Sequence, residues 1–288
     1  MKSPSFRSAN LRQAYDLALA GALGALCGLY LYVELVQLDS VWVRDALAGV
    51  AIGGSVGFFL NAWGPARDGA WLKLARDATW GTLAGAVGGA LGLVVGELVL
   101  GTLQGGLAGR AISWAILGLG IGASQGLAAR SRQRLAYGLI GGTVGGSGGG
   151  FLFEAIREGM GDRYDLGQGL GIVLLGAGLG LALALVEQVL RRAWVQVLRG
   201  RQEGRAYLLA GRRSALGLDE RAEVGLFGDP TVARQHAEIV ATGRDYILKG
   251  LAPAGRTAVN GVVVVGERAL ADGDRIELGQ TLLLFRRR

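Results

Sequence analysis

The chain has 288 residues, of which 52 are glycine; 51% are hydrophobic and only 18% are charged. This composition excludes an intrinsically disordered chain, which is poor in apolar residues, and a collagen-like chain, because there are only 4 prolines and glycine has no three-residue period. A single cysteine and a single histidine exclude an internal disulfide and a histidine-rich metal site, and the formal net charge is +7.

Glycine and charge divide the chain near residue 190. Residues 1–190 hold 39 of the 52 glycines, with 13 basic and 12 acidic side chains. Residues 191–288 hold 17 basic and 11 acidic side chains. The change predicts a glycine-rich apolar domain at residues 1–192, followed by a basic and more polar domain at residues 193–288.

Long uncharged runs indicate that the first domain lies in a membrane. The runs are residues 17–33, 46–66, 78–96, 111–129, 135–153 and 166–186. About 20 apolar residues in a helix cross the hydrocarbon core, so we expect an all-α membrane domain with six transmembrane helices. The expected spans are residues 14–36, 42–63, 74–98, 110–129, 134–156 and 167–190. A secretory signal peptide is the alternative for the first run, but five similar runs follow it.

Basic residues alternate between the two sides of these spans. They gather in the N-terminal tail, in the second and fourth connections, and after the sixth span: Lys2, Arg7 and Arg12; Arg67, Lys73 and Arg76; Arg130, Arg132 and Arg134; Arg191, Arg192, Arg199 and Arg201. The positive-inside rule therefore predicts a multi-pass membrane protein with its N and C termini in the cytoplasm. Arginine greatly outnumbers lysine, which is typical of GC-rich bacteria and favours the bacterial inner membrane.

Glycines recur at every fourth position inside the expected spans. The series are Gly49, Gly53 and Gly57; Gly81, Gly85 and Gly89; Gly118, Gly122 and Gly126; and Gly138, Gly142, Gly146 and Gly150. Four residues return to nearly the same helix face, so each series predicts a smooth stripe for close helix packing, a glycine zipper. The alternative is a glycine-lined pore. Packing is favoured because acidic residues such as Glu154 fall near the expected span ends, where water would solvate them.

Short strands replace the long apolar runs after residue 192. The expected strands are residues 194–198, 206–209, 224–227, 237–241, 246–249, 259–265, 275–278 and 281–285, with Asn260-Gly261 among the turns. Short strands in close succession predict an all-β sandwich. The sixth helix should end near Arg192, which leaves almost no linker before the sandwich.

Several ordered motifs in the second domain carry a family resemblance. They are Leu216-Gly217, residues 229–237, residues 257–261 and residues 270–279. Together they resemble a forkhead-associated (FHA) domain over residues 193–287. The resemblance implies a β-sandwich of eleven strands whose loops at one end bind phosphothreonine peptides. It therefore implies a cytoplasmic protein partner rather than a substrate.

The resemblance also implies which positions meet the peptide. These are Leu218, Ala233, Arg234, Gly255, Arg256, Thr257 and Asn260, while Gly217, His236 and Gly261 shape the loops. Leu218 stands where the family has arginine, and Ala233 stands where it has serine. Without these charge-assisted donors, we expect phosphopeptide binding to be weak or absent. The alternative is that Arg212, Arg213 or Arg256 supplies a substitute phosphate contact.

The leading functional interpretation is an integral membrane adaptor, scaffold or signalling protein that presents an FHA-like domain to a cytoplasmic protein. The alternative is a pore or transporter for a small solute or ion, regulated by that domain. We expect no enzyme, cofactor or metal, because no nucleophile–base pair or ligand cluster is visible. The basic residues after the last span predict contact with lipid rather than nucleic acid. Self-association is left open.

Overall fold

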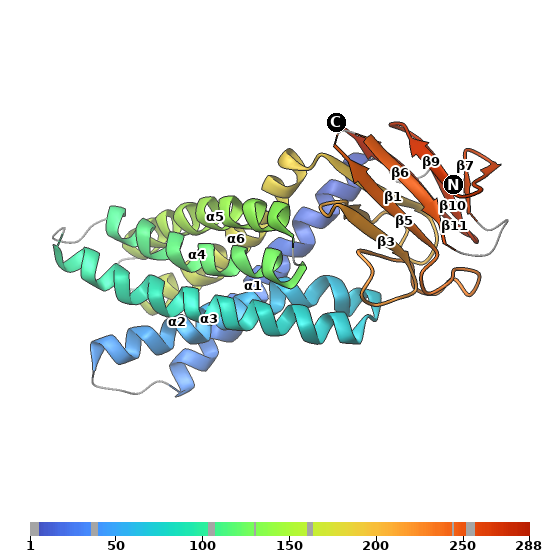
Figure 1. Ribbon diagram of the computed structural model, residues 1–288. Helices are drawn as coiled ribbons and strands as arrows, with labels where there is room; N and C mark the ends of the chain where they lie inside the picture. Colours follow the sequence, from blue (N-terminus) through green and yellow to red (C-terminus); the bar gives the residue numbers. More distant parts are fainter. Residues whose placement is uncertain are drawn as a thin grey trace. The chain divides into compact units, whose positions relative to one another are not determined.

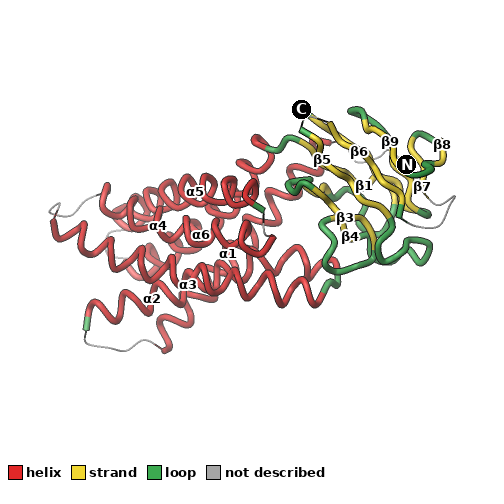
Figure 2. Tube along the Cα trace, viewed as in Figure 1, coloured by secondary structure: helices red, strands yellow, loops and turns green. Residues whose placement is uncertain are grey.

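The structure is a computed structural model that describes residues 6–35, 40–102, 107–129, 131–159, 164–243, 245–251 and 257–288. Within this part of the chain, six helices precede eleven strands (Figures 1 and 2). The chain forms two compact units. One contains Ala14–Ala66 and Leu74–Val189, and the other combines Leu190–Arg288 with Arg67–Lys73 and the stretch that ends at Gln13.

Each expected apolar run lies inside a helix. The helices are α1 (Phe6–Leu35), α2 (Val41–Asp68), α3 (Trp71–Thr102), α4 (Leu107–Ala129), α5 (Arg132–Gly159) and α6 (Tyr164–Leu190). Among the described residues, four of them, α1, α2, α3 and α6, are long and apolar enough to cross a membrane. A shorter apolar helix spans Ala111–Leu127 of α4. The six helices are thus confirmed, while the number that cross the membrane stays a prediction.

Three helices supply most of the large buried side chains of the helical unit. A shared pattern, apolar-Gly-x-x-apolar-Gly, occurs in α2, α4 and α6 at residues 52–57, 117–122 and 175–180. Its apolar side chains are almost fully buried and belong to one core cluster: Ile52, Val56, Leu117, Ile121, Leu175 and Leu179. Each large side chain thus points into the core, while the glycine that follows it is free to meet a neighbouring helix.

The glycines of the four-residue series lie against neighbouring helices. A Cβ atom at Gly53 would lie 2.2 Å from the carbonyl oxygen of Gly85, and one at Gly122 would lie 1.9 Å from that of Gly138. Ordinary Cβ contacts begin at 3.4 Å, so any larger residue would push the backbones apart. At all thirteen positions, such a Cβ would meet an atom within 3.0 Å. This geometry favours close packing over the lining of a pore.

A second glycine face lies on each odd-numbered helix, and the sequence analysis did not single it out, although its glycines also recur at every fourth position. The facing pairs are Gly24 with Val56 (α1 and α2), Gly88 with Gly120 (α3 and α4) and Gly145 with Leu179 (α5 and α6). Gly21 of α1 faces Gly176 of α6. Each helix therefore meets the next one in sequence, and the contact between α1 and α6 closes the ring.

Glu154 of α5 corrects one expectation. Its side chain is 5% exposed, so the prediction that water solvates it at a span end is wrong. The reason is its helical phase: Glu154 lies four residues after Gly150, on the buried stripe of α5. The carboxyl group is thus directed into the helical unit rather than outward.

The C-terminal domain is a sandwich of two sheets. Its strands are β1 (Ala193–Arg199), β2 (Ala206–Leu208), β3 (Arg213–Gly217), β4 (Val224–Gly225), β5 (Ala237–Thr242), β6 (Asp245–Gly250), β7 (Thr257–Val259), β8 (Val262–Val263), β9 (Glu267–Leu270), β10 (Arg275–Leu278) and β11 (Thr281–Arg287). The six-stranded sheet has the order β2-β1-β11-β10-β7-β8, and the five-stranded sheet has the order β4-β3-β5-β6-β9. Both sheets contribute to a single core that includes Val195, Leu216, Ile239 and Phe285.

The expected all-β sandwich is confirmed, with three differences in its strands. β3 and β9 are absent from the expected set, because their sequences, RSALG and ERAL, contain no β-branched or aromatic residue. The expected strand at residues 259–265 is instead divided between β7 and β8. Asn260 and Gly261 turn the chain there, with φ angles of 53° and 77° that suit a tight hairpin. The connection from α6 to β1 is short, as expected: only Arg191 and Arg192 separate them.

Candidate functional site

Several loops gather at one end of the sandwich, which we call the loop end. The register of the strands places them there: Leu216 pairs with Ala237, and Ala237 with Gly250, in one sheet. In the other sheet, Leu278 pairs with Thr257 and with Thr281. The β3–β4 loop (218–223), the β4–β5 loop (226–236), the β10–β11 turn (279–280) and the β1–β2 turn (200–205) therefore emerge at the same end.

The β3–β4 and β4–β5 loops are held together by their backbones. The amide of Leu218 donates to the carbonyl oxygen of Ala233 at 3.1 Å, and the amide of Asp219 donates to that of Arg234 at 3.0 Å. A Cβ atom at Gly217 would lie 2.2 Å from the carbonyl oxygen of Arg234. Glycine at position 217 is therefore what allows the two loops to approach this closely.

His236 lies fully buried beneath these loops. Its Nδ1 accepts a hydrogen bond from the amide of Ala233 at 3.0 Å, so this nitrogen carries no hydrogen atom. Its own amide donates to Leu216, and its carbonyl oxygen accepts from Leu251. The interpretation of His236 as a loop-shaping residue stays a prediction, and this set of contacts supports it.

The positions that the family resemblance assigns to the peptide are only partly brought together. Leu218 packs against the core of the sandwich, and Ala233 lies beside it through the backbone contact described above. Arg234 is exposed at the loop end. The hydroxyl of Thr257 is buried and has no hydrogen-bond partner among the described residues. Gly255 and Arg256 lie outside the described residues.

Asn260 lies away from the loop end, so the structure does not group it with Leu218 and Ala233. Its Nδ2 donates to Asp274 at 2.8 Å, and its Oδ1 accepts from the amide of Arg275 at 2.9 Å. Both polar atoms of the amide thus fasten the β7–β8 hairpin to the start of β10. In this structure Asn260 is a turn residue, together with Gly261, and its role as a peptide contact stays a prediction.

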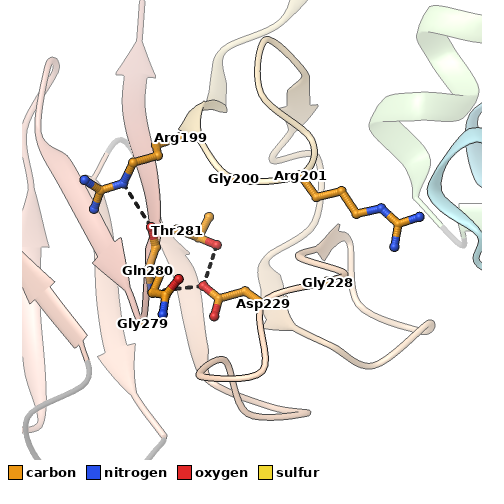
Figure 3. A pocket seen from close by; sticks show the side chains of 8 residues that line it. All are labelled: Arg199, Gly200, Arg201, Gly228, Asp229, Gly279, Gln280 and Thr281. Atoms are coloured by element: carbon orange, nitrogen blue, oxygen red, sulfur yellow. Dashed lines mark hydrogen bonds between the residues drawn. The ribbon is translucent and has the colours of Figure 1, made fainter.

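Asp229 is a loop-end residue that the sequence reasoning did not single out. Its carboxylate accepts from the hydroxyl of Thr281 and the amide of Gln280, each at 2.9 Å (Figure 3). It also accepts from the amide of Thr231 at 2.9 Å and from the hydroxyl of Thr231. Burial raises the pKa of Asp229, but these hydrogen bonds outweigh burial and hold it below 3.8. The turn-forming sequence Asp229-Pro230-Thr231 is the signal that could have found it.

This carboxylate also borders a surface pocket of about 580 Å³. The pocket is lined by Arg199, Gly200, Arg201, Gly228, Asp229, Gly279, Gln280 and Thr281. Figure 3 shows that the side chains of Arg199 and Arg201 point away from one another. Arg199 donates from its Nε to the carbonyl oxygen of Gln280 at 3.1 Å. The two guanidinium groups thus do not converge on a shared anion, and they form no phosphate clamp in this pocket.

Comparisons with known proteins show that the C-terminal domain is similar to one family model and to solved FHA domains. Residues 196–288 match the family described as the inner membrane component of T3SS, cytoplasmic domain. Similar solved structures include an FHA domain from a study of phosphothreonine-dependent interactions, with 33% identity over 34% of this chain and 97% of that chain (TM-score 0.31). The FHA domain of FhaA, complexed with an intracellular domain, shows 33% identity over 33% of this chain and 99% of that chain (TM-score 0.30). An FHA domain from Chlamydia trachomatis shows 24% identity over 34% of this chain and 98% of that chain (TM-score 0.32). The comparison with curated proteins gave no match.

Proposed function

Because the C-terminal domain belongs to the FHA-like domains, we propose that the chain is an integral membrane scaffold that presents this domain to a protein partner in the cytoplasm. Its binding would depend little or not at all on phosphate. No catalytic step, cofactor, metal or nucleic acid is part of this proposal. The lipid bilayer is the second partner, through the helices.

The observation that carries the proposal is the loss of phosphate donors at the loop end. Leu218, at the family's arginine position, directs an apolar side chain against the core. Ala233 has no hydroxyl, and its amide already donates to His236. Recognition of a phosphate requires several charge-assisted hydrogen bonds, and neither residue can supply one from its side chain. The loops that remain are well ordered by their own hydrogen bonds and offer a surface for protein.

The membrane part of the proposal rests on the helices and on the distribution of charge. We propose that all six helices cross the membrane with both termini in the cytoplasm. Large apolar side chains are exposed on the outer surface of the helical unit, among them Phe58, Leu83, Val87 and Val144. The exposure of such side chains is unfavourable in water, whereas contact with apolar lipid tails is favourable. The description of the matched family extends the proposal to the bacterial inner membrane and to a role in T3SS.

The experiment is a binding titration with the cytoplasmic domain, residues 191–288, whose core is closed within those residues. Phosphothreonine peptides and matched unphosphorylated peptides should bind with the same weak affinity. The double substitution Leu218→Arg and Ala233→Ser supplies the two donors and should create a phosphate preference, measured in a variant whose circular dichroism spectrum matches that of the native domain. A preference of about tenfold or more for phosphopeptides in the native domain would contradict the proposal.

A crosslinked pull-down from native membranes then identifies the partner. The full-length chain should capture a cytoplasmic or membrane protein through its loop end. Substitution of Arg234, which is exposed there, by glutamate should reduce that capture. A partner that binds equally well when the whole cytoplasmic domain is removed would show that the helices, rather than the FHA-like domain, form the scaffold.

A further inference from the structure

The loop end of the sandwich contacts a second segment of the same chain. Residues Arg67–Lys73, the turn between α2 and α3, belong to the same compact unit as the sandwich. Two polar contacts join them. Arg205 forms an ion pair with Asp68, and the carboxylate of Glu220 accepts a hydrogen bond from the amide of Leu72 at 2.6 Å. Arg205 ends the β1–β2 turn and Glu220 lies in the β3–β4 loop, so both contacts come from the loop end.

The side chain of Arg205 is also oriented by a contact with Tyr207. Its guanidinium group lies over the ring of Tyr207, 5.6 Å from the ring centroid. The buried hydroxyl of Tyr207 in turn donates to the carbonyl oxygen of Gly225 at 3.2 Å. The side chains of Arg205 and Asp68 are only 26% and 9% exposed, so water screens the pair less than it would a surface ion pair.

Glu220 supplies a group that α3 itself lacks. The first amides of a helix have no acceptor within the helix, and the positive end of the helix dipole favours an anion there. The first turn of α3 contains no acidic residue, and Leu72 is the second residue of that helix. The β3–β4 loop is fixed in turn, since the carboxylate of Asp219 accepts from the amide of Arg221 at 2.9 Å. Glu220 therefore caps α3 from a rigid loop.

We propose that the turn between α2 and α3 is the resident ligand of the loop end. An unphosphorylated segment of the same chain, with Asp68 as its anion and the start of α3 as its donor, occupies the part of the loop end that the β1–β2 turn and the β3–β4 loop form. Any partner that uses Arg205 or Glu220 has to displace this turn. The inference rests on the proposed function, because it treats the loop end as the partner-binding surface.

The test is site-directed crosslinking in the full-length chain, reconstituted in lipid nanodiscs. In a Cys27→Ser background, Trp71→Cys and Arg221→Cys place two exposed thiols next to the contacts while retaining Leu72 and Glu220. A short bis-maleimide should join them efficiently. The matched control pairs Trp71→Cys with Thr242→Cys, since Thr242 lies at the end of β5 away from the loop end. Equal crosslinking of the two pairs would overturn the inference.

Charge exchange tests the chemistry of the contact. Arg205→Glu should lower the crosslinking rate of the first pair about tenfold, because it places two carboxylates together. Adding Asp68→Arg should restore the rate to within about twofold, which a misfolded domain could not do. No loss with Arg205→Glu, or no recovery in the exchanged pair, refutes the intrachain contact. The peptide titration uses residues 191–288, which lack the turn between α2 and α3, so its failure would count against the proposed function alone.

Discussion

Replacing Gly142 by alanine should push α4 and α5 apart. The new Cβ would lie 2.0 Å from the carbonyl oxygen of Gly118 and 2.7 Å from its carbonyl carbon. Restoring an ordinary contact distance of 3.4 Å requires the two helices to separate by about 1.4 Å, over which dispersion contacts weaken steeply. Lipid removes the hydrophobic drive for helix association, so these contacts are what hold the pair together. We expect the free energy of unfolding to fall by about 1–3 kcal/mol.

Gly148 on the same helix provides the matched control. A Cβ there meets nothing within 4 Å, and its replacement by alanine brings the same gain in helix propensity. Gly148→Ala should therefore leave the unfolding free energy unchanged or raise it by up to about 1 kcal/mol. The assay is reversible unfolding in mixed micelles, followed by far-UV circular dichroism as the fraction of denaturing detergent rises. If Gly142→Ala and Gly148→Ala unfold at the same detergent fraction, the packing argument is wrong.

Three further predictions concern polar side chains that form hydrogen bonds. Asp229→Asn removes an acceptor that holds Thr281 and the β4–β5 loop, so the isolated cytoplasmic domain should lose about 1–3 kcal/mol in urea denaturation; unchanged stability would show that the loops hold without it. Burial raises the pKa of Tyr207 while Arg205 opposes this, and the folded domain keeps the phenol proton longer than the unfolded chain does. Tyr207 therefore contributes fully to the free energy of unfolding below pH 10, and this contribution is lost as the pH rises further. In urea melts between pH 9 and 11, the free energy of unfolding should fall less steeply with pH in Tyr207→Phe than in the native domain. Finally, Asn61 of α2 donates to Ser124 of α4 at 2.9 Å, so Asn61→Leu should cost roughly 0.6–2 kcal/mol in the mixed-micelle assay, and an unaltered midpoint would argue against that bond.

The sequence predicted the helices and the first glycine face because both depend on short spacings. Four-residue spacing is visible in Gly118, Gly122 and Gly126, and each of these lies against α5. The second face has the same spacing, in Gly88, Gly92 and Gly96, but spacing does not show which neighbouring helix each series meets. The choice of neighbouring helix depends on contacts between residues far apart in the sequence, and neither composition nor spacing predicts it.

The candidate site shows the same division between local and distant information. The motifs located Gly217, Leu218 and Ala233 because the chain order of an FHA domain places them near one another. They did not reveal that Asn260 lies at the opposite end of β7 from the loop end, since a motif gives the order of residues and not the end of the strand at which a side chain lies. The partnership of Asp68 with Arg205 spans 137 residues and follows no pattern, so only the fold could reveal it.

The closure of the helical ring by α1 and α6 bears on how the protein is made. Gly21 faces Gly176, and Gly180 faces Leu17, so α1 packs against a helix that is synthesised only after the four helices between them. Hairpins such as α2 with α3, or α4 with α5, can pack as soon as both helices are inserted. The face of α1 that contains Gly21 remains in contact with lipid until α6 is inserted. A chain truncated before α6 would thus leave this glycine face of α1 without its neighbouring helix.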